Sequence, residues 1–292
     1  MNKRISVIVI TLLGMFVFIA ILLVSLLTAE AAYAESDNRK RPKPTPTKSA
    51  RDLPPMDPWW QPSPGVTWHW QLSKSLVLWR DVDMYDIDMF ENDGSVVDFL
   101  HADGQVVVAY ISAGSWEQWR PDADDFPQEV IGNKNGWKGE RWLDIRRIDL
   151  IGPIMEARLD MAVDRGYDGI EFDNVDGYTN NTGFPLTAQD QLNYNIWLAE
   201  AAHARGLSVG LKNDIEQVVE LEPYFDWAIN EQCFQYEECE GLLVFINNGK
   251  PVFNVEYKKG LKKFCPQANE WGFSSMKKKR KLNAWCKNCW QY

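Results

Sequence analysis

The sequence predicts an α/β protein whose fold is a (β/α)8 TIM barrel, a closed ring of parallel strands surrounded by helices. Eight short apolar segments with strand character alternate with segments of helical periodicity along most of the chain. The chain has 292 residues, which is long enough for one such barrel. An open doubly wound sheet shows the same alternation, but eight strands favour the barrel.

The predicted strands are short and end at turn residues. The clearest is 105–112 (QVVVAYIS), which is almost entirely apolar, as expected for a strand buried on both faces. The full set is 68–72, 84–90, 105–112, 169–173, 207–212, 227–233, 251–257 and 271–275.

Helices are expected between these strands. Thr187 and Asp190 have the spacing of a capping box, and Gly206 is placed to end the helix that begins there. Gly166 is placed to end the helix before strand 169–173. The predicted helices are 95–102, 145–165, 188–205, 215–221, 236–247 and 258–264.

The N-terminal region has the pattern of an export signal. Basic residues precede an apolar run from 5 to 27, and Ala32-Tyr33-Ala34 fits a cleavage site. The run is also long enough to span a bilayer, which would make it an uncleaved membrane tether. We therefore expect a secreted domain, or one that is membrane-anchored and faces outward. The expected parts are a signal peptide or signal anchor at 1–34, a Pro-, Lys- and Arg-rich linker at 35–58 and the folded domain at 59–292.

All five cysteines lie in the last third of the chain: Cys233, Cys239, Cys265, Cys286 and Cys289. In an exported protein they are expected to form two disulfides and leave one free thiol, with the pairing open. The spacing of the last two also occurs in zinc sites. The three histidines lie far away in the sequence, however, so no metal is expected.

The charge of the chain is unevenly distributed. Residues 57–257 hold 36 acidic and 13 basic side chains, a net charge of −23, whereas residues 258–292 hold 10 basic and one acidic. An acidic domain repels nucleic acid and attracts polycations, although solubility alone explains the same charge. The basic run 277–281 contains no aromatic residues, so nucleic acid binding is not expected.

Functional side chains of a barrel gather where its strands end. The most informative strand end lies in the stretch 169–178 (GIEFDNVDGY), where Glu171 and Asp173 face the same side of the strand. Turn chemistry explains Asp176, but it does not explain two acids on one strand, because burying unpaired charge is costly. The polar residues at the predicted strand ends are Gln71, Asp88, Ser112, Asp173, Lys212, Asn213, Glu231 and Glu256.

Glu231 ends the sixth strand, across the mouth of the predicted barrel from Asp173. Glycoside hydrolysis uses such a pair, because one carboxyl group protonates the leaving oxygen while the other attacks the anomeric carbon or activates water. Our hypothesis makes Asp173 the nucleophile or base and Glu231 the acid, and the reverse remains open. The sequence has no paired metal-binding histidines, no G-x-S-x-G elbow and no phosphate loop, so no cofactor is expected.

From Trp68 to the C-terminus the sequence resembles glycoside hydrolase family 114, the endo-α-1,4-polygalactosaminidases. The resemblance implies a (β/α)8 barrel that cleaves α-1,4-linked galactosamine-rich polysaccharide, with the catalytic aspartate at Asp173 and the glutamate at Glu231. The matching stretches are WHWQL (68–72), AYISAGSWEQW (109–119), GERWLDI (139–145), DGIEFDNVDGY (168–178), GFPLTAQDQ (183–191), LKN (211–213), NEQCFQY (230–236) and NVEY (254–257).

A cationic amino-sugar polysaccharide as partner agrees with the acidic charge of residues 57–257. Lys212 is expected to keep a catalytic carboxylate ionised. Two alternatives stay open: a hydrolase of a neutral α-galactoside, which would be α-galactosidase-like, and a non-catalytic carbohydrate-binding barrel. The residues expected to pair with substrate amines are Asp88, Glu117, Asp176 and Glu256. Those expected to stack on or otherwise contact sugars are Tyr110, Tyr178, Trp116, Gln71, Ser112 and Asn213.

Overall fold

The computed structural model describes residues 59–292, so the predicted export segment and linker lie outside the described residues. Within them, one sheet has the order β1-β2-β3-β7-β8-β9-β10-β11-β12, and every neighbouring pair except β11 and β12 is parallel. The strands are β1 (Trp68–Gln71), β2 (Met84–Asp88), β3 (Val106–Ser112), β7 (Gly169–Asp173), β8 (Ser208–Lys212), β9 (Trp227–Glu231), β10 (Val252–Glu256), β11 (Ser274–Lys278) and β12 (Cys286–Asn288).

The sheet curls until its first and eighth strands meet. The Trp68 indole donates to the Ser274 carbonyl over 2.7 Å, and the Ser274 hydroxyl donates to the Val66 carbonyl over 2.6 Å. Further along, the buried Lys278 ammonium donates to the Trp70 carbonyl. These side-chain bonds join β1 to β11, and the predicted (β/α)8 barrel is confirmed.

The barrel interior is filled by large apolar side chains, chiefly Trp68, Trp70, Trp227 and Phe253. Gly210 on β8 makes room for them, because a Cβ at this position would lie 2.1 Å from the Trp227 ring. A second, larger apolar layer packs between the outside of the sheet and the helices. The barrel centre is therefore a packed core, and open space is left only above it.

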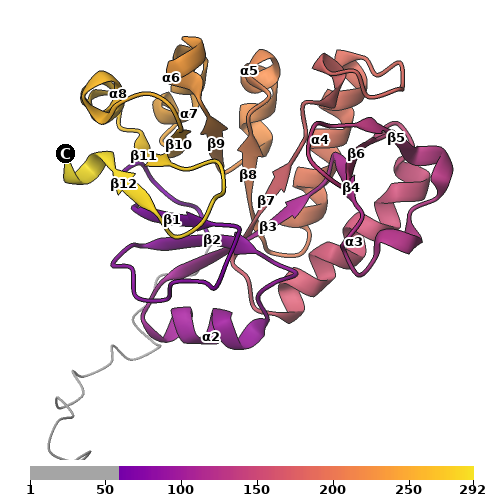
Figure 1. Cartoon of the computed structure of the whole chain (residues 1–292), viewed down its shortest axis with the longest axis horizontal. Coiled ribbons are helices and arrows are strands. Elements are labelled where there is room, and N and C mark those ends of the chain that lie inside the picture. Colours follow the sequence, from indigo (N-terminus) through magenta and orange to yellow (C-terminus); the bar gives the residue numbers. More distant parts are fainter. Residues whose placement is uncertain (1–58) are drawn as a thin grey trace, which may run out of the picture. The chain divides into compact units, whose positions relative to one another are not determined.

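The helices surround the sheet in chain order (Figure 1). They are α2 (Gly94–Ala102), α3 (Ile148–Asp164), α4 (Ala188–His203), α5 (Val218–Leu221), α6 (Cys233–Tyr236), α7 (Leu243–Asn247) and α8 (Leu261–Glu270). Short 3₁₀ turns lie at Ala123–Asp125, Gln128–Val130, Gly177–Thr179, Ile215–Gln217, Glu222–Tyr224, Cys239–Leu242 and Cys289–Gln291.

Several local predictions are confirmed. The capping box of Thr187 and Asp190 starts α4. Gly166 and Gly206 have φ values of +81° and +75°, the left-handed conformation that ends a helix. No helix in residues 59–292 has the length and apolarity needed to cross a membrane.

The structure differs from the prediction in several places, and the helix expected at 258–264 runs instead from Leu261 to Glu270. The expected helices 215–221 and 236–247 are broken into short helices and 3₁₀ turns. The last parallel strand begins at Ser274 rather than at 271, because Gly272, with a φ of +75°, ends α8 just before it. A small antiparallel sheet between β3 and α3 was not predicted: β4 (Ser115–Glu117), β6 (Glu140–Leu143) and β5 (Ile131–Lys134) pair in that order.

The cysteines form two disulfides, Cys233–Cys239 and Cys265–Cys289, and Cys286 is free. The expectation of two bridges and one free thiol is confirmed. Because Cys289 is bridged to α8, the C-x-x-C spacing at the C-terminus does not form a metal-binding pair.

Candidate active site

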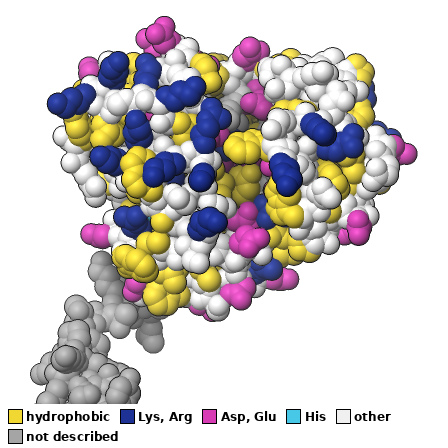
Figure 2. All heavy atoms as spheres, in the orientation of Figure 1, with side chains coloured by type: hydrophobic (Ala, Val, Ile, Leu, Met, Phe, Trp, Pro, Cys, Tyr) yellow, Lys and Arg dark blue, Asp and Glu magenta, His cyan; other side chains and the backbone are white. Residues whose placement is uncertain are grey.

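A cavity of about 910 Å³ lies at the carboxyl ends of the parallel strands, the end of a barrel where catalytic residues gather. Figure 2 shows this face hollowed near its middle. Charged side chains line the cavity together with tryptophans. Its size falls within the range of ligand sites, roughly 300–1,000 Å³.

Lys212, at the end of β8, is the centre of the charged network. Its ammonium lies 2.7 Å from Glu171 Oε1, 3.0 Å from Asp173 Oδ1 and 3.6 Å from Glu231 Oε2. It also lies 4.9 Å from the centre of the Trp70 ring, and its side chain is 1% exposed. Burial lowers the pKa of this lysine, but the three carboxylates raise it well above its ordinary value, so the cation is permanent at neutral pH.

Asp173 is held by two donors at the cavity wall. The Tyr110 hydroxyl donates to its Oδ2 over 2.8 Å, while Lys212 contacts its Oδ1. Burial raises the pKa of this carboxyl, but Lys212, Tyr110 and the Asn174 backbone together bring it below its ordinary value. Asp173 is therefore ionised, although it lies in a largely enclosed site.

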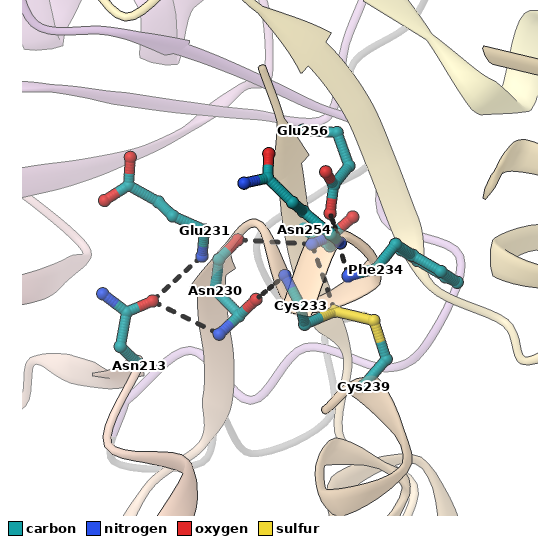
Figure 3. The surroundings of a disulfide bond; sticks show 9 residues. Asn213, Asn230, Glu231, Cys233, Phe234, Cys239, Asn254 and Glu256 are labelled. Carbon is teal, nitrogen blue, oxygen red and sulfur yellow. Dashed lines mark hydrogen bonds between the residues drawn. A yellow bond between two sulfur atoms is a disulfide. The ribbon is translucent and has the colours of Figure 1, made fainter. Parts of the chain in front are cut away.

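Glu231 is placed by a network at the end of β9. Its backbone N–H donates to Asn213 Oδ1 over 2.9 Å, and its carboxylate accepts a hydrogen bond from the Tyr257 hydroxyl. Asn230 Oδ1 accepts from the Cys233 N–H, and the Cys233–Cys239 disulfide fixes the segment that follows (Figure 3). The Glu231 carboxylate points away from the disulfide and lines the cavity.

Below the catalytic pair, Glu171 and Asp86 are fully buried. Glu171 accepts from the Trp70 indole over 3.0 Å and from Lys212. An ionised Asp86 would find no donor for either carboxylate oxygen among the described residues. Burial and the charge of Glu171 raise the pKa of Asp86 well above its ordinary value. A protonated Asp86 can donate to Glu171 through one oxygen, so the pair carries one negative charge opposite Lys212.

Asp88 and Glu117 share one cation, Arg120. The guanidinium donates to both Asp88 oxygens over 2.8 Å and to the two Glu117 oxygens over 2.7 and 2.9 Å. All three side chains are nearly buried at the cavity wall. This cluster carries one net negative charge rather than two.

Asp176 also lines the cavity, in the loop after β7. Burial and the nearby Asp173 raise its pKa to about 6. Behind it, Asp214 accepts from Asn195 over 2.9 Å, and burial together with Asp176 raises the pKa of Asp214 to about 8. Asp176 therefore changes charge close to neutral pH while facing the cavity.

Three tryptophans form an aromatic rim on the small antiparallel sheet and its loops: Trp119, Trp137 and Trp142. Trp119 and Trp137 are 52% and 56% exposed. Trp119 lies over the turn at Gly139, where a Cβ would meet the indole ring at 3.0 Å. Exposed indole faces beside a polar cavity are suited to stacking on sugar rings.

The structure brings most of the predicted site residues to this cavity. The lining includes Gln71, Asp88, Tyr110, Glu117, Asp173, Asp176, Lys212, Asn213 and Glu231. Ser112, Tyr178 and Glu256 are not among the lining residues, and neither is Trp116. Ser112 bonds to Ser115, Tyr178 bonds to Glu216, and Glu256 accepts from the backbone N–H groups at the start of α6.

Tyr257 and Arg280 line the cavity and were not predicted. Strand alternation could have found Tyr257, because it follows Phe253 and Val255, which both face the barrel interior. The aromatic rim was also missed, since it lies on strands too short to show a period.

Two carboxylates beside one buried ammonium, at the carboxyl end of a parallel barrel and next to an aromatic rim, define a barrel glycoside hydrolase. The sequence profile of glycoside-hydrolase family GH114 matches residues 50–292. The chain belongs to this family.

The chain is also similar to two solved structures and to a further protein. The chain is 42% identical to Aspergillus fumigatus Ega3, solved in complex with galactosamine, with a TM-score of 0.75 over 79% of this chain and 97% of that chain. The glycoside hydrolase domain of PelA from Pseudomonas aeruginosa shares the fold, with 13% identity and a TM-score of 0.61 over 77% of this chain and 98% of that domain. An uncharacterized protein of Deinococcus radiodurans is 24% identical over 224 residues, which cover 66% of this chain and 70% of that protein.

Proposed function

We propose that this glycoside hydrolase cuts an α-1,4-linked, galactosamine-rich polysaccharide from within the polymer, with Asp173 as nucleophile or base and Glu231 as general acid. The observation that carries the proposal is the pairing of these carboxylates on Lys212 inside the cavity. The galactosamine complex of the 42% identical Ega3 supports the choice of sugar.

The different surroundings of the two carboxylates support the assignment of roles. Asp173 accepts from Tyr110 and lies 3.0 Å from the ammonium, so its charged form is stabilised twice. Glu231 lies further from the same ammonium, at 3.6 Å. The group that attacks or activates water must be ionised, and Asp173 meets this requirement better.

The reaction needs one proton to move to the departing sugar oxygen. Glu231 supplies it while Tyr257 holds the carboxyl group in place. Asp173 either attacks the anomeric carbon, forming a glycosyl ester that water then hydrolyses while Glu231 takes the water's proton, or removes a proton from the attacking water. Lys212 offsets the charge of Asp173 throughout, and the aromatic rim holds neighbouring sugars.

The test is the release of reducing ends from partially deacetylated galactosaminogalactan by the purified protein. Asp173→Asn and Glu231→Gln should each lower turnover by orders of magnitude, with unchanged thermal unfolding. Asp149→Asn is the matched control, because this carboxylate is exposed on α3 and its one ion pair within residues 59–292 is with Arg147. Wild-type activity in both site variants would refute the proposed chemistry. A folded wild-type protein that binds the polymer without cutting it would favour a binding role instead.

We also propose that the protein is exported, either released or tethered to the membrane through residues 5–27. The apolar run and the small-residue site at Ala32-Tyr33-Ala34 support this. N-terminal sequencing of the mature protein distinguishes the outcomes. A start at Glu35 indicates release, whereas an intact N-terminus in the membrane fraction indicates an anchor. An intact protein found in the soluble cell interior would contradict export.

A further inference from the structure

We propose that the cavity selects polymer segments in which amino sugars on one side of the cut adjoin uncharged sugars, N-acetylated or amine-free, on the other. This inference rests on the proposed function, because it concerns the charge pattern of the same substrate. The observation behind it is that charges of opposite sign line two different sectors of the cavity rim.

The acidic sector is formed by β2, β3, β7 and the small antiparallel sheet. Its acidic lining residues are Asp88, Glu91, Glu117, Glu140 and Asp176. Arg120 offsets part of this charge by bonding to Asp88 and Glu117. The ion pairs within residues 59–292 include no cation on Glu91, Glu140 or Asp176. A sugar ammonium is therefore favoured in this sector.

The basic sector is formed by the loops after β1 and β11. Lys74, Arg280 and Lys281 line the cavity from these loops. Among residues 59–292, none of the three has a carboxylate within ion-pair distance. Figure 2 shows basic side chains gathered on the side of this face where Figure 1 places β11, β12 and α8.

The basic sector is fixed in place by the backbone. The N–H groups of Leu72 and Ser73 both donate to the Leu282 carbonyl, over 2.9 and 3.2 Å. This pair of bonds joins the loop that carries Lys74 to the turn that carries Arg280 and Lys281. The positive charges are therefore held at the rim together.

Arg280 brings this positive charge close to the proposed proton donor. Its guanidinium donates to Gln232 over 2.9 Å and lies 5.4 Å from the centre of the Tyr257 ring. Tyr257 in turn bonds to Glu231. An ammonium on a sugar beside Glu231 would meet a like charge, whereas an acetamido or hydroxyl group there would not. A linear polymer that crosses both sectors is therefore complementary to the cavity only when its amino sugars lie in the acidic sector and its uncharged sugars lie in the basic sector.

Three synthetic oligosaccharides of equal length test this inference. One carries an amine on every sugar. The other two join an amine block to an N-acetylated block, in the two opposite orders along the α-1,4 backbone. We expect one block order to be cut with a kcat/KM at least about tenfold above that of the reverse order and of the all-amine compound, a difference that corresponds to about 1.4 kcal/mol.

The variant for this test reverses the charge of two exposed lysines of the basic sector, Lys74→Glu with Lys281→Glu. Its preference should move toward the all-amine compound by about tenfold or more, and the difference between the block orders should shrink. The matched control is Lys262→Glu with Lys263→Glu, an equal charge change on exposed positions of α8 outside the cavity lining. The control should keep the wild-type preference.

Equal cleavage of both block orders by the wild type, or a preference unchanged by the charge reversal, would overturn the inference. Calorimetric measurement of how tightly the Asp173→Asn protein binds each of the three compounds compares the same preference in the absence of turnover. If the wild type cuts none of them but one block order binds tighter, the proposed function fails while the inference stands. Equal binding of both block orders would contradict the inference without affecting the proposed function.

Discussion

Replacing Lys212 by methionine removes the cation that the two proposed catalytic carboxylates share. The side chain is 1% exposed, so methionine keeps most of its volume while removing the charge. Glu171, Asp173 and Glu231 would then face one another without a counterion. We expect kcat/KM to fall by at least about three orders of magnitude, because the ionised form of Asp173 loses its main support.

The distances give the size of the effect on ionisation. At 3.0 Å and an effective dielectric constant of about 20, one ion pair contributes roughly 5 kcal/mol. Asp173 is 21% exposed, so water screens part of this, and we take about 3 kcal/mol. Losing this interaction should therefore raise the pKa of Asp173.

The sign of the pH effect follows from the direction of the shift. In the wild type the pKa of Asp173 is lowered, so the base is available down to acid pH, and its contribution to folding is lost only as the pH falls through that low pKa. In Lys212→Met the ammonium no longer offsets burial, and the pKa of Asp173 rises although the Tyr110 and Asn174 hydrogen bonds remain. The acid limb of kcat/KM should therefore move to higher pH.

The assay is a pH profile of the residual kcat/KM, measured together with thermal unfolding. Lys250→Met is the matched control, because Lys250 pairs with Glu222 at 2.7 Å and does not line the cavity. The control should lose a little stability and keep the wild-type profile. A Lys212→Met enzyme whose acid limb stays at the wild-type pH would refute the role given to this ammonium.

Three further outcomes are expected. Affinity for a cationic oligosaccharide should fall as the pH drops through about 6, because the cavity-lining Asp176 becomes neutral. In calorimetric titrations, Asp176→Asn should flatten this pH dependence. An unchanged slope of affinity against pH in the variant would contradict the role given to Asp176. Cys233→Ser with Cys239→Ser removes a bridge that closes a short loop, so denaturant unfolding should show a loss of about 2 kcal/mol, and an unchanged midpoint would speak against the bridge. Gly210→Ala places a Cβ 2.1 Å from the Trp227 ring and should cost about 1–3 kcal/mol in thermal unfolding, so a variant as stable as the wild type would disprove the packing.

The positions of the strands and of helices α2, α3 and α4 could be predicted because they follow from local periodicity. Whether a side chain at the end of a strand points into the barrel or toward the helices was harder to predict, because it depends on where the alternation of the strand begins. Asp173, Lys212 and Glu231 are in phase with interior neighbours and reach the cavity. Glu256 is one residue out of phase with Phe253 and Val255, so it turns toward the helix layer and accepts hydrogen bonds at the start of α6.

Contacts between distant segments were beyond the sequence. The loops after β1 and β11 meet only because the barrel closes, and more than 200 residues separate Leu72 from its partner Leu282. Arg280 lies near Tyr257 because β11 pairs with β10, and no local sequence pattern shows that pairing. The basic run 277–281 was therefore not expected at the site, although Arg280 and Lys281 line the cavity.

Net charge also gave an incomplete account of the site. The charge of −23 over residues 57–257 agrees with a cationic substrate. However, some of the acids at the cavity already form ion pairs within the protein and others do not. Asp88 and Glu117 already hold Arg120, and Asp173 already holds Lys212. The acids left to meet a sugar ammonium are Glu91, Glu140 and Asp176.

Recognition of amines therefore depends on a few acids in one sector and not on the charge of the whole domain. An enzyme that relied on overall charge would lose affinity gradually as any surface acid was removed, and salt would weaken binding of every cationic oligosaccharide equally. A cavity with two oppositely charged sectors behaves differently. Salt should weaken the attraction at one sector and the repulsion at the other together, so rising ionic strength should reduce the preference between the two block orders more than it reduces affinity itself.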